Sequence, residues 1–321
     1  GAATAGDASA SVAFTAPANV GGSAISAYYA VSNPSRVTVS GASSPINVTG
    51  LTNGTAYTFS VWALNTYGPS PFSGASGSVT PAVPPIGLFG GGYNGATSVN
   101  TIQKITISTT GNTTSFGDLS TARWYSAAFS SSTRGVWAGG TLAGFSKSNV
   151  VDYVTIATAG NAASFGLLSD RRTSLAGCSS ETRGVVGGGI DNSDVRVNII
   201  EYFTIATTGN ATDFGDLTLT RDKLSSFSSP TRGVWAGGAT SGGNSNVIDY
   251  VTIASTGNAT DFGDLTGARS DLAGCSSSTR GIVGGSQASS AVMDYVTIAT
   301  TGNAVSFGNL TVGVSGPGAL S

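Results

Sequence analysis

The strongest constraint on the fold is an internal repeat that runs from residue 86 to the end of the chain. Each copy contains a Tyr-Val-Thr-Ile-like stretch, then a Gly-Asn pair, then a Phe-Gly pair. The Gly-Asn pairs are separated by 49, 49, 48 and 45 residues and begin at Gly111, Gly160, Gly209, Gly257 and Gly302. Such a period predicts a supersecondary unit that buries its apolar surface only by stacking on its neighbours.

Each of the five copies is predicted to form four short β-strands. In the third copy they fall near residues 173–179, 183–188, 198–207 and 211–217, where β-branched and aromatic residues are bounded by turn residues. We expect the Gly-Asn pair at a hairpin tip with positive φ, and glycine doublets that let adjacent sheets approach closely. Four strands in about 48 residues is typical of a propeller blade. The predicted fold class is all-β, with a five-bladed β-propeller over residues 86–321.

These repeats resemble kelch-type repeats, although the kelch tryptophan is replaced by a phenylalanine that lies 12 residues after the tyrosine. The resemblance rests on glycine doublets (Gly139-Gly140, Gly188-Gly189, Gly237-Gly238, Gly284-Gly285), tyrosines (Tyr153, Tyr202, Tyr250, Tyr295) and arginines (Arg123, Arg172, Arg221, Arg269). The first copy starts at its second strand. We therefore expect residues 312–320 to supply the missing innermost strand and close the ring.

Large and small residues alternate from copy to copy at two matching positions. The second copy has Phe129 and Trp137 where the third has Cys178 and Val186. The fourth and fifth copies repeat this exchange, with Phe227 and Trp235 followed by Cys275 and Val283. Sheets that interdigitate require such alternation, so we expect both tryptophans to be buried between sheets.

Residues 1–82 are predicted to form a separate β-sandwich, joined to the repeats by a stiff linker at residues 83–85. We expect strands at residues 11–15, 25–31 and 56–63. The stretches 50–57 and 63–71 resemble a fibronectin type III module whose N-terminal edge is missing. The resemblance implies a tyrosine corner at Tyr57, a core anchor at Leu51, and Phe14 in place of the family's buried tryptophan.

Composition excludes several function classes. The 321 residues include no histidine, which removes Ser-His-Asp and Cys-His catalysis and His-ligated zinc or copper. Fourteen basic and sixteen acidic residues give a net charge of −2, without the basic cluster that a nucleic-acid or anionic membrane partner requires. No apolar stretch approaches the roughly 20 residues that span a bilayer. We expect no enzyme activity, no catalytic residues and no cofactor.

Three other groups have structural interpretations that we prefer to functional ones. The acids Asp152, Glu201, Asp249 and Asp294 recur in step with the arginines, which favours ion pairs between blades over a hydrolase site. The two cysteines occupy one repeat position and are expected to be buried thiols; a disulfide or a reactive thiol is the alternative. The acidic loop 191–194 lacks the glycine and glutamate of a calcium loop, so no metal site is expected. Six Asn-x-Ser/Thr sequons occur, and we expect no glycan on them unless the source is eukaryotic.

The loops between the second and third strands differ most between copies, at residues 92–101, 141–150, 190–197, 239–246 and 286–291. They are expected to gather on one face and to bind any ligand or receptor there; unconstrained drift is the alternative. The candidate ligand-face residues are Tyr93, Phe145, Lys147, Asp191, Asp194 and Arg196.

The repeated phrase Thr-Gly-Asn-Ala-Thr-Asp-Phe-Gly-Asp-Leu-Thr resembles repeats in structural proteins of marine tailed phages, including cyanophages. With a fibronectin-like module beside it, the chain is similar to phage fibre and decoration proteins. This implies a non-enzymatic virion surface protein that adheres to host-surface glycans as part of a larger oligomeric assembly with other virion or surface proteins. A secreted bacterial adhesin or an extracellular filament subunit is the alternative. Either reading places the protein on the virion surface or outside the cell.

Overall fold

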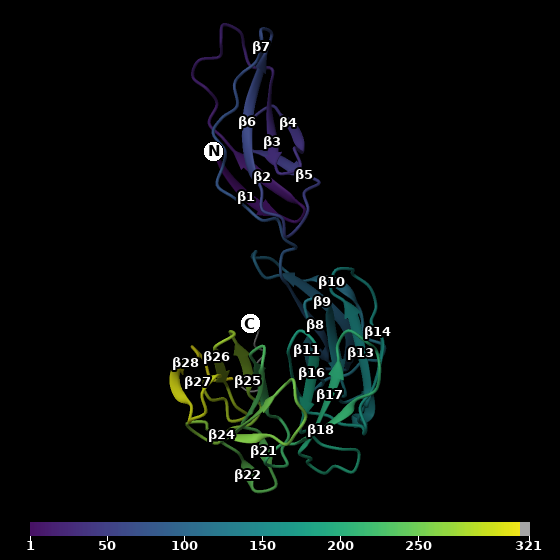
Figure 1. Ribbon diagram of the computed structural model, residues 1–321. Helices are drawn as coiled ribbons and strands as arrows, with labels where there is room; N and C mark the ends of the chain where they lie inside the picture. Colours follow the sequence, from purple (N-terminus) through teal and green to yellow (C-terminus); the bar gives the residue numbers. More distant parts are fainter. Residues whose placement is uncertain (315–321) are drawn as a thin grey trace. The chain divides into compact units, whose positions relative to one another are not determined.

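The computed structural model describes residues 1–314 and shows an all-β protein made of antiparallel sheets (Figure 1). The one short helical element among these residues is the 3₁₀ turn η1 (Ala143–Phe145). The chain divides into two compact units. Unit 1 comprises residues 1–86 together with 106–111, and unit 2 comprises residues 87–105 together with the chain from residue 112 onward.

Unit 1 consists of two small sheets with strand orders β1-β2-β5 and β4-β3-β6-β7. Side chains along β3 and β6 alternate between buried and half-buried positions, which is the two-residue period of strands that cover a core on one face. That core includes Leu51, Tyr57 and Phe59, and Phe14 packs against its edge. The strands are β1 (Ala2–Gly6), β2 (Ser9–Ala13), β3 (Ala27–Asn33), β4 (Thr38–Gly41), β5 (Ile46–Thr49), β6 (Thr58–Asn65) and β7 (Gly68–Pro69).

The expected strands of unit 1 are present with ends shifted by about two residues, and β1 forms a sheet edge ahead of the strand expected at residues 11–15. The segment after β7 continues along the edge of the sheet β4-β3-β6-β7 and bonds to β6 through both backbone and side-chain groups. Ser70, Ser73 and Ser76 donate their backbone N–H groups to the carbonyls of Ala63, Val61 and Phe59. Their hydroxyl oxygens accept hydrogen bonds of 2.9–3.0 Å from the N–H groups of the same three β6 residues. Three residues of this segment therefore match two residues of β6.

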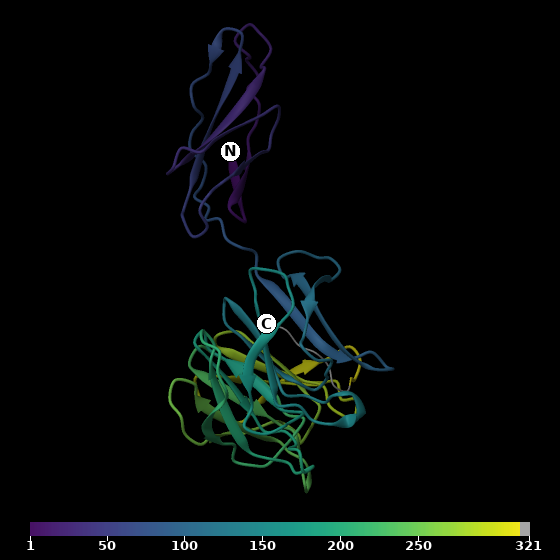
Figure 2. The same ribbon diagram turned by 90° about the vertical axis from the view of Figure 1, so that its right-hand side faces the viewer.

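Residues 86–314 form five consecutive sheets, as the repeat predicts (Figures 1 and 2). The first sheet has three strands and each of the other four has four strands, paired in sequence order. The first sheet comprises β8 (Ile86–Tyr93), β9 (Ser98–Thr106) and β10 (Thr114–Asp118). The second comprises β11 (Ala127–Ser130), β12 (Arg134–Ala138), β13 (Val150–Thr155) and β14 (Ala163–Leu167).

The third sheet comprises β15 (Ala176–Ser179), β16 (Arg183–Gly187), β17 (Ile199–Thr204) and β18 (Thr212–Asp216). The fourth comprises β19 (Ser225–Ser228), β20 (Arg232–Ala236), β23 (Val247–Thr252) and β24 (Thr260–Asp264). A short hairpin, β21 (Ala239–Thr240) with β22 (Gly243–Asn244), lies between β20 and β23. The fifth sheet comprises β25 (Ala273–Ser276), β26 (Arg280–Gly284), β27 (Val292–Thr297) and β28 (Val305–Asn309).

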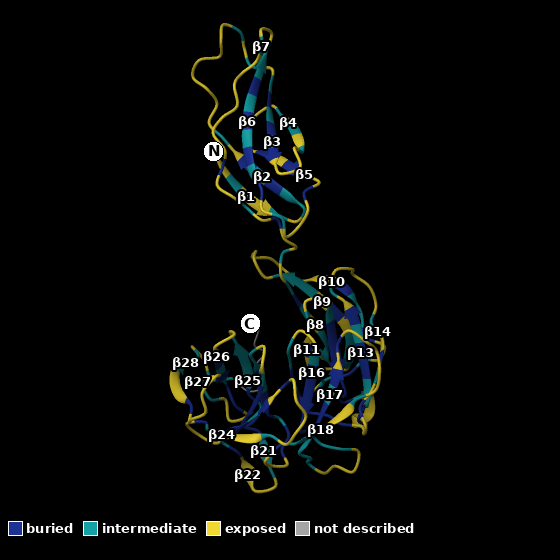
Figure 3. Cartoon of the chain, viewed as in Figure 1, coloured by how far each residue is buried: buried dark blue, intermediate teal, exposed yellow. Residues whose placement is uncertain are grey.

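The sheets pack face to face on their sequence neighbours, and the cores lie between them (Figure 3). The expected alternation of large and small side chains is present. Phe129 covers Gly184 of the next sheet, and Phe227 covers Gly281 in the same way. Where the first strand carries the small Cys178, the next sheet supplies the fully buried Trp235. Trp137 is also buried. The repeats are therefore joined through complementary apolar faces rather than through shared strands.

The glycine doublets have the expected role. A Cβ atom at Gly139 or Gly188 would lie 2.6 Å from the carbonyl oxygen of the arginine in the next connection, so only glycine permits this approach. The Gly-Asn pair agrees with our expectation only in part: Gly257 and Gly302 have positive φ, of 157° and 153°, whereas Gly111, Gly160 and Gly209 do not. The pair belongs to a longer loop, residues 156–162 in the second sheet, and packs against the preceding sheet.

This packing places the Gly-Asn carbonyl against the glycine of the preceding Phe-Gly pair. A Cβ atom at Gly166 would lie 2.1 Å from the Gly209 oxygen. The asparagine side chain completes the contact, since Asn210 Oδ1 accepts a hydrogen bond of 3.1 Å from Leu167 N–H. The same bond joins Asn161 to Asp118, Asn258 to Asp216 and Asn303 to Asp264. The recurring Gly-Asn pair thus forms a contact between neighbouring sheets in the second to fifth copies.

The recurrent acids and arginines form buried ion pairs, as predicted, with a different connectivity. Each arginine lies in the connection before a sheet and pairs with the acid on the third strand of that same sheet, so the pair does not bridge two sheets. In the fourth sheet Arg221 Nη2 lies 2.7 Å from Asp249 Oδ2, and both side chains are fully buried. The other pairs are Arg123–Asp152, Arg172–Glu201 and Arg269–Asp294.

The connection after the fifth sheet keeps the backbone geometry of the repeat up to Val314. The N–H group of Ser286 donates to the carbonyl of Val314, as the N–H group of Gly140 donates to that of Arg172. Val314 therefore occupies the position that arginine holds in the earlier connections. We expected residues 312–320 to complete the first sheet. Residues 312–314 lie instead in the connection after the fifth sheet, and residues 315–320 lie outside the described part of the chain.

Candidate ligand-binding face

The loops that follow the second strands are tied to the connections between sheets. Thr141 pairs with Trp124 and Ile190 pairs with Thr173, in each case a loop residue with the connection that precedes the same sheet. Neighbouring repeats are also joined here, because the hydroxyl oxygens of Thr141 and Thr173 lie 2.6 Å apart. Loops and connections of successive sheets therefore share one face of unit 2.

Four aromatic side chains gather on this face where the first and second repeats meet. Trp124 is at the centre, with ring-centroid distances of 5.3 Å to Tyr93, 4.4 Å to Tyr125 and 6.3 Å to Phe145. The outer rings are largely open to solvent, with exposed fractions of 54% for Tyr93, 47% for Tyr125 and 80% for Phe145. We call these four residues the aromatic cluster. None of its four residues belongs to the cores between the sheets.

The backbone around the cluster fixes the directions of these rings. Trp124 and Thr141 exchange two backbone hydrogen bonds of 3.0 and 2.7 Å, which hold the Trp124 backbone beside the loop that carries Phe145. Tyr125 and Phe145 both have left-handed φ angles, of 54° and 64°. Non-glycine residues in this region are uncommon and are held there by their surroundings. The cluster is therefore built on constrained backbone.

Tyr125 also borders a pocket of about 270 Å³ that is lined by equivalent residues of four repeats. Tyr125 and its equivalents Ser174, Lys223 and Asp271 all have φ between 54° and 57°. Their backbones form a chain of hydrogen bonds of 2.9–3.0 Å, in which each N–H donates to the carbonyl one repeat earlier. The lining residues are Tyr125, Ser126, Ser174, Leu175, Lys223, Leu224, Asp271 and Leu272.

The pocket presents polar groups beside the exposed ring of Tyr125. Lys223 Nζ lies 3.1 Å from Asp271 Oδ2, so the two charges of the lining are paired. Ser174, whose backbone N–H donates to the carbonyl of Tyr125, also lines the pocket. Aromatic rings that adjoin a small pocket of mixed polar and apolar lining offer both apolar contact and hydrogen bonds to one ligand.

The structure separates the six candidate residues into two groups. Tyr93 and Phe145 join the aromatic cluster. The charged residues make contacts within the protein instead: Lys147, which is buried, pairs with Asp194, and Arg196 pairs with Asp222.

Asp191 has an internal role as well. Its Oδ1 accepts backbone hydrogen bonds of 2.8 and 2.9 Å from Ser193 and Val195. The acidic loop is thus stabilised by its own contacts. Among residues 1–314, no group of three or more His, Cys, Asp or Glu side chains is placed to hold a metal ion.

Sequence reasoning missed Trp124, at the centre of the cluster, and Tyr125, which stacks on it. The missed signal is the comparison of connections: Arg123-Trp124-Tyr125 stands where the later ones have Arg172-Thr173-Ser174, Arg221-Asp222-Lys223 and Arg269-Ser270-Asp271. Two large aromatic residues therefore stand at positions where the other copies have small or polar residues.

The two cysteines are free thiols. Cys178 is buried among apolar side chains, and burial raises its pKa to about 12. Cys275, at the same repeat position in the fifth sheet, is partly exposed. Among the described residues, no helix is long and apolar enough to cross a membrane.

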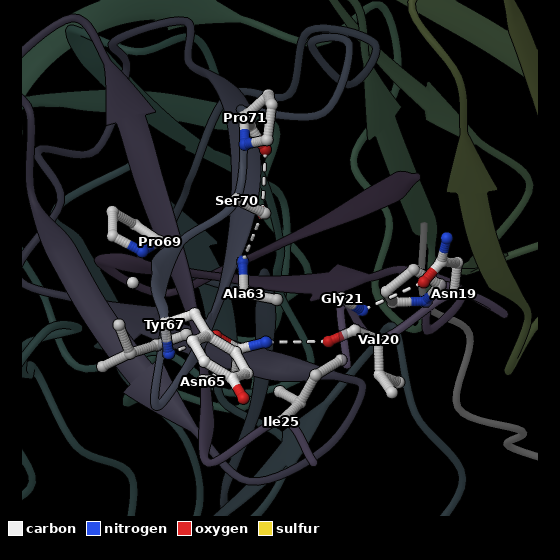
Figure 4. Close-up of a pocket in the computed structure, with 13 residues that line it drawn as sticks. Asn19, Val20, Gly21, Ile25, Ala63, Asn65, Tyr67, Pro69, Ser70 and Pro71 are labelled. Carbon is white, nitrogen blue, oxygen red and sulfur yellow. Dashed lines mark hydrogen bonds between the residues drawn. The ribbon is translucent and has the colours of Figure 1, made fainter. Parts of the chain in front are cut away.

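A second pocket, of about 310 Å³, lies in unit 1 between residues 17–25 and 63–71 (Figure 4). Asn65 closes one side, since its Nδ2 donates a hydrogen bond of 2.7 Å to the carbonyl of Val20. The lining consists of prolines, other apolar and small residues, two asparagines and the exposed ring of Tyr67, with no charged side chain. It offers much less chemistry than the face of unit 2.

Comparisons with known proteins give a likeness of fold. No protein-family description matches the chain, and no curated protein is similar to it in sequence. The chain is similar to a solved structure titled "Structure of YjhT", with a TM-score of 0.58 and 10% sequence identity. The match covers 72% of this chain and 86% of that chain. At this identity the likeness concerns the fold alone.

Proposed function

We propose that unit 2 is built from five divergent kelch-like β-propeller blades, without closure between the fifth and first sheets among residues 86–314, and that unit 1 is a fibronectin type III-like module. Support for the propeller comes from the five sheets in sequence order and from the repeat motifs. Support for the module comes from its two packed sheets and from Tyr57, whose buried hydroxyl accepts a hydrogen bond of 3.1 Å from Thr52 N–H. That bond to the backbone just upstream is the contact a tyrosine corner makes.

We propose that the protein is a non-enzymatic adhesion protein that binds glycans through the aromatic cluster. The observation that carries this proposal is the aromatic cluster, in which Tyr93, Tyr125 and Phe145 expose their rings around the half-buried Trp124, beside the pocket that Tyr125 borders. A pyranose ring has an apolar C–H face that can lie on an aromatic ring, and hydroxyl groups at its rim that need hydrogen-bond partners. The Trp124–Tyr125 stack and the Ser174–Lys223–Asp271 lining offer these two surfaces side by side.

A catalytic role has less support. The sequence contains no histidine, and the recurrent carboxylates are each paired with a buried arginine. Such acids lie out of solvent and bond to the arginine side chain, which suits a structural role better than proton transfer.

The proposed setting is the surface of a virion, where the chain would be part of a fibre or a capsid decoration among other virion proteins. Support comes from the repeated phrases, which resemble those of marine tailed-phage structural proteins. A secreted bacterial adhesin or filament subunit is the second candidate. Mass spectrometry of purified particles and of culture supernatant distinguishes them, because a virion protein is enriched in the particles.

A glycan array probed with the full chain tests the binding proposal. We expect binding to at least one glycan class, with affinity reduced about tenfold or more by Trp124→Ala or Phe145→Ala, as for truncated aromatic anchors in other interfaces. Tyr67→Ala is the matched control, because Tyr67 is equally exposed but lies in unit 1. An array without signal, or equal losses in all three variants, would exclude the aromatic cluster as a glycan site.

A further inference from the structure

The fifth sheet exposes the face that each earlier sheet uses to pack on its successor. This face, which we call the trailing face, consists of one apolar side chain from each strand of the sheet and one from the connection that follows. In the fifth sheet these residues are Cys275, Ile282, Met293, Phe307 and Leu310. All five are exposed or half-exposed, whereas their equivalents in the second, third and fourth sheets are buried.

Phe307 shows the difference most clearly. Its exposed fraction is 45%, while Phe116, Phe165, Phe214 and Phe262 at the same repeat position are 2–4% exposed. Figure 3 shows β28 as an exposed strand. An apolar ring that is buried in four copies and open in the fifth belongs to a surface built for contact.

The glycine of the Phe-Gly pair in the fifth sheet, Gly308, also has no contact within residues 1–314 of the kind its equivalents make. Gly117, Gly166, Gly215 and Gly263 each face the Gly-Asn carbonyl of the next sheet, so closely that a Cβ atom would lie within 2.5 Å of its oxygen. Gly308 has the same backbone conformation as Gly263, with φ of 138° against 140°, and a Cβ atom there would meet nothing within 4 Å. The fifth sheet thus has the receptor for a Gly-Asn loop and holds no such loop among the described residues.

The first sheet exposes the complementary leading face. Phe89 stands where Trp137, Val186, Trp235 and Val283 are buried against the preceding sheet, yet its exposed fraction is 42%. Ile105, at the position of the buried Val154 and Val251, is half-exposed. Asn112 is the one asparagine of the Gly-Asn series with no sheet ahead of it in the chain.

The sizes of the facing residues also match. Along the chain, the large Phe129 meets the small Val186, the small Cys178 meets the large Trp235, and Phe227 meets Val283. The next pair in this alternation is the small Cys275 with a large partner, and Phe89 is large. An opposite choice at either position would leave a cavity or a clash.

A recurring hydrogen bond between neighbouring sheets also has, within residues 86–314, an unused donor in the fifth sheet and an unused acceptor position in the first. Arg134, Arg183 and Arg232 each donate from Nη1 to the carbonyl of an isoleucine in the next sheet, at 2.8–2.9 Å. Arg280 is the fourth member and stacks on Tyr295 as its equivalents stack on theirs. The isoleucine at the matching position of the first sheet is Ile107.

We propose that the fifth sheet binds the first sheet of a second copy of this chain, in a head-to-tail contact that repeats the four sheet-to-sheet contacts within the chain. The occupant is a second copy because both faces are open within residues 86–314 of one and the same chain, where the first sheet does not cover the fifth. The inference is independent of glycan binding. A contact of this kind joins unlike surfaces and builds chains or larger rings.

Cross-linking between two different variants tests the contact. By the repeat register, Asn112 of one copy bonds to the backbone of Asn309 of the other, as Asn303 bonds to Asp264. We mix full-length Asn112→Cys with full-length Asn309→Cys under mild oxidation and identify disulfides by peptide mapping. The mixed disulfide is expected to form about tenfold faster or more than the disulfide within either variant alone, as a docked pair of thiols has a high effective concentration.

Two further variants make the result specific. Phe307→Asp, introduced into the Asn309→Cys chain, is expected to abolish the mixed disulfide, while Leu219→Asp leaves it, because Leu219 is similarly exposed but lies outside both faces. Phe89→Asp in the other chain repeats the test from the leading face, and circular dichroism verifies that each variant is folded.

The competing arrangement is closure within one chain. A double variant Asn112→Cys/Asn309→Cys that cross-links internally at every dilution would overturn the proposal in favour of a closed ring. Equal rates for the mixed and the single-variant disulfides would overturn it in favour of no contact.

Discussion

The indole Nε1 of Trp235 donates a hydrogen bond of 3.1 Å to the carbonyl of Ala176, which lies on the first strand of the preceding sheet. The side chain is fully buried in the core between the third and fourth sheets, beside Cys178. One residue thus contributes both apolar area and a polar bond to the same contact. Its loss should affect the joint between two repeats rather than the interior of either.

Trp235→Ala is expected to lower the free energy of unfolding by about 3–5 kcal/mol, because a large buried side chain is removed and its cavity cannot collapse. Trp137→Ala is expected to cost a similar amount. Urea denaturation followed by circular dichroism measures both. A change below about 1 kcal/mol in either variant would show that the tryptophan is not a buried joint.

Gly166→Ala should destabilise the protein although it adds a single methyl group. The new Cβ would lie 2.1 Å from the Gly209 carbonyl oxygen, and backbone cannot move aside as a flexible side chain can. We expect a loss of about 1–3 kcal/mol or more. Gly209→Ala is the matched control, since a Cβ there meets nothing within 4 Å. Equal thermal midpoints for the two variants would contradict the packing role of Gly166.

Asp249→Asn leaves the buried Arg221 guanidinium without a counter-charge. That guanidinium also donates to the carbonyls of Gly237 and Val247, so it cannot turn toward water without breaking those bonds. A loss of about 3–5 kcal/mol is expected. The matched control is Asp261→Asn, because Asp261 is exposed and lies opposite Asp249 on the adjacent strand. This substitution should change the free energy of unfolding by less than about 0.5 kcal/mol. Comparable effects in chemical denaturation would argue against a special role for the buried pair.

The two cysteines should react at very different rates with a thiol reagent. Burial of Cys178 raises its pKa to about 12, so at pH 8 almost none of it is the reactive thiolate, and the reagent has no access. Cys275 is partly exposed. We expect one thiol to be labelled in the folded protein and both in urea. Labelling of Cys178 before Cys275, identified by mass spectrometry, would contradict the assigned burial.

The sheet architecture was predictable because the repeat supplies five versions of the same pattern. Strand number and order, the burial of Trp137 and Trp235, and the close approach at Gly139 all follow from residues that recur in register. The function of Gly-Asn was harder to predict, because the pair contacts the preceding sheet at Gly166 and its equivalents. Local turn rules describe a residue's own loop and contain no information about its neighbour across an interface.

The candidate site was predictable in place and only partly in composition. Exposure was correctly expected for Tyr93 and Phe145, because each lies in a variable loop. Lys147 lies in the same loop as Phe145 but is buried against Asp194 of the next repeat, a partner 47 residues away. Trp124 was missed because the candidates were taken from the variable loops, and Trp124 lies in the connection between the first and second sheets. Pairings over such distances depend on how repeats stack.

The segment after β7 has a consequence for the edge of its sheet. Ser70, Ser73 and Ser76 satisfy both backbone groups of their β6 partners, in a ladder with a three-residue spacing. A foreign strand has donors and acceptors at a two-residue spacing, so it cannot continue this sheet in register. This edge of unit 1 is therefore closed to strand addition by another molecule.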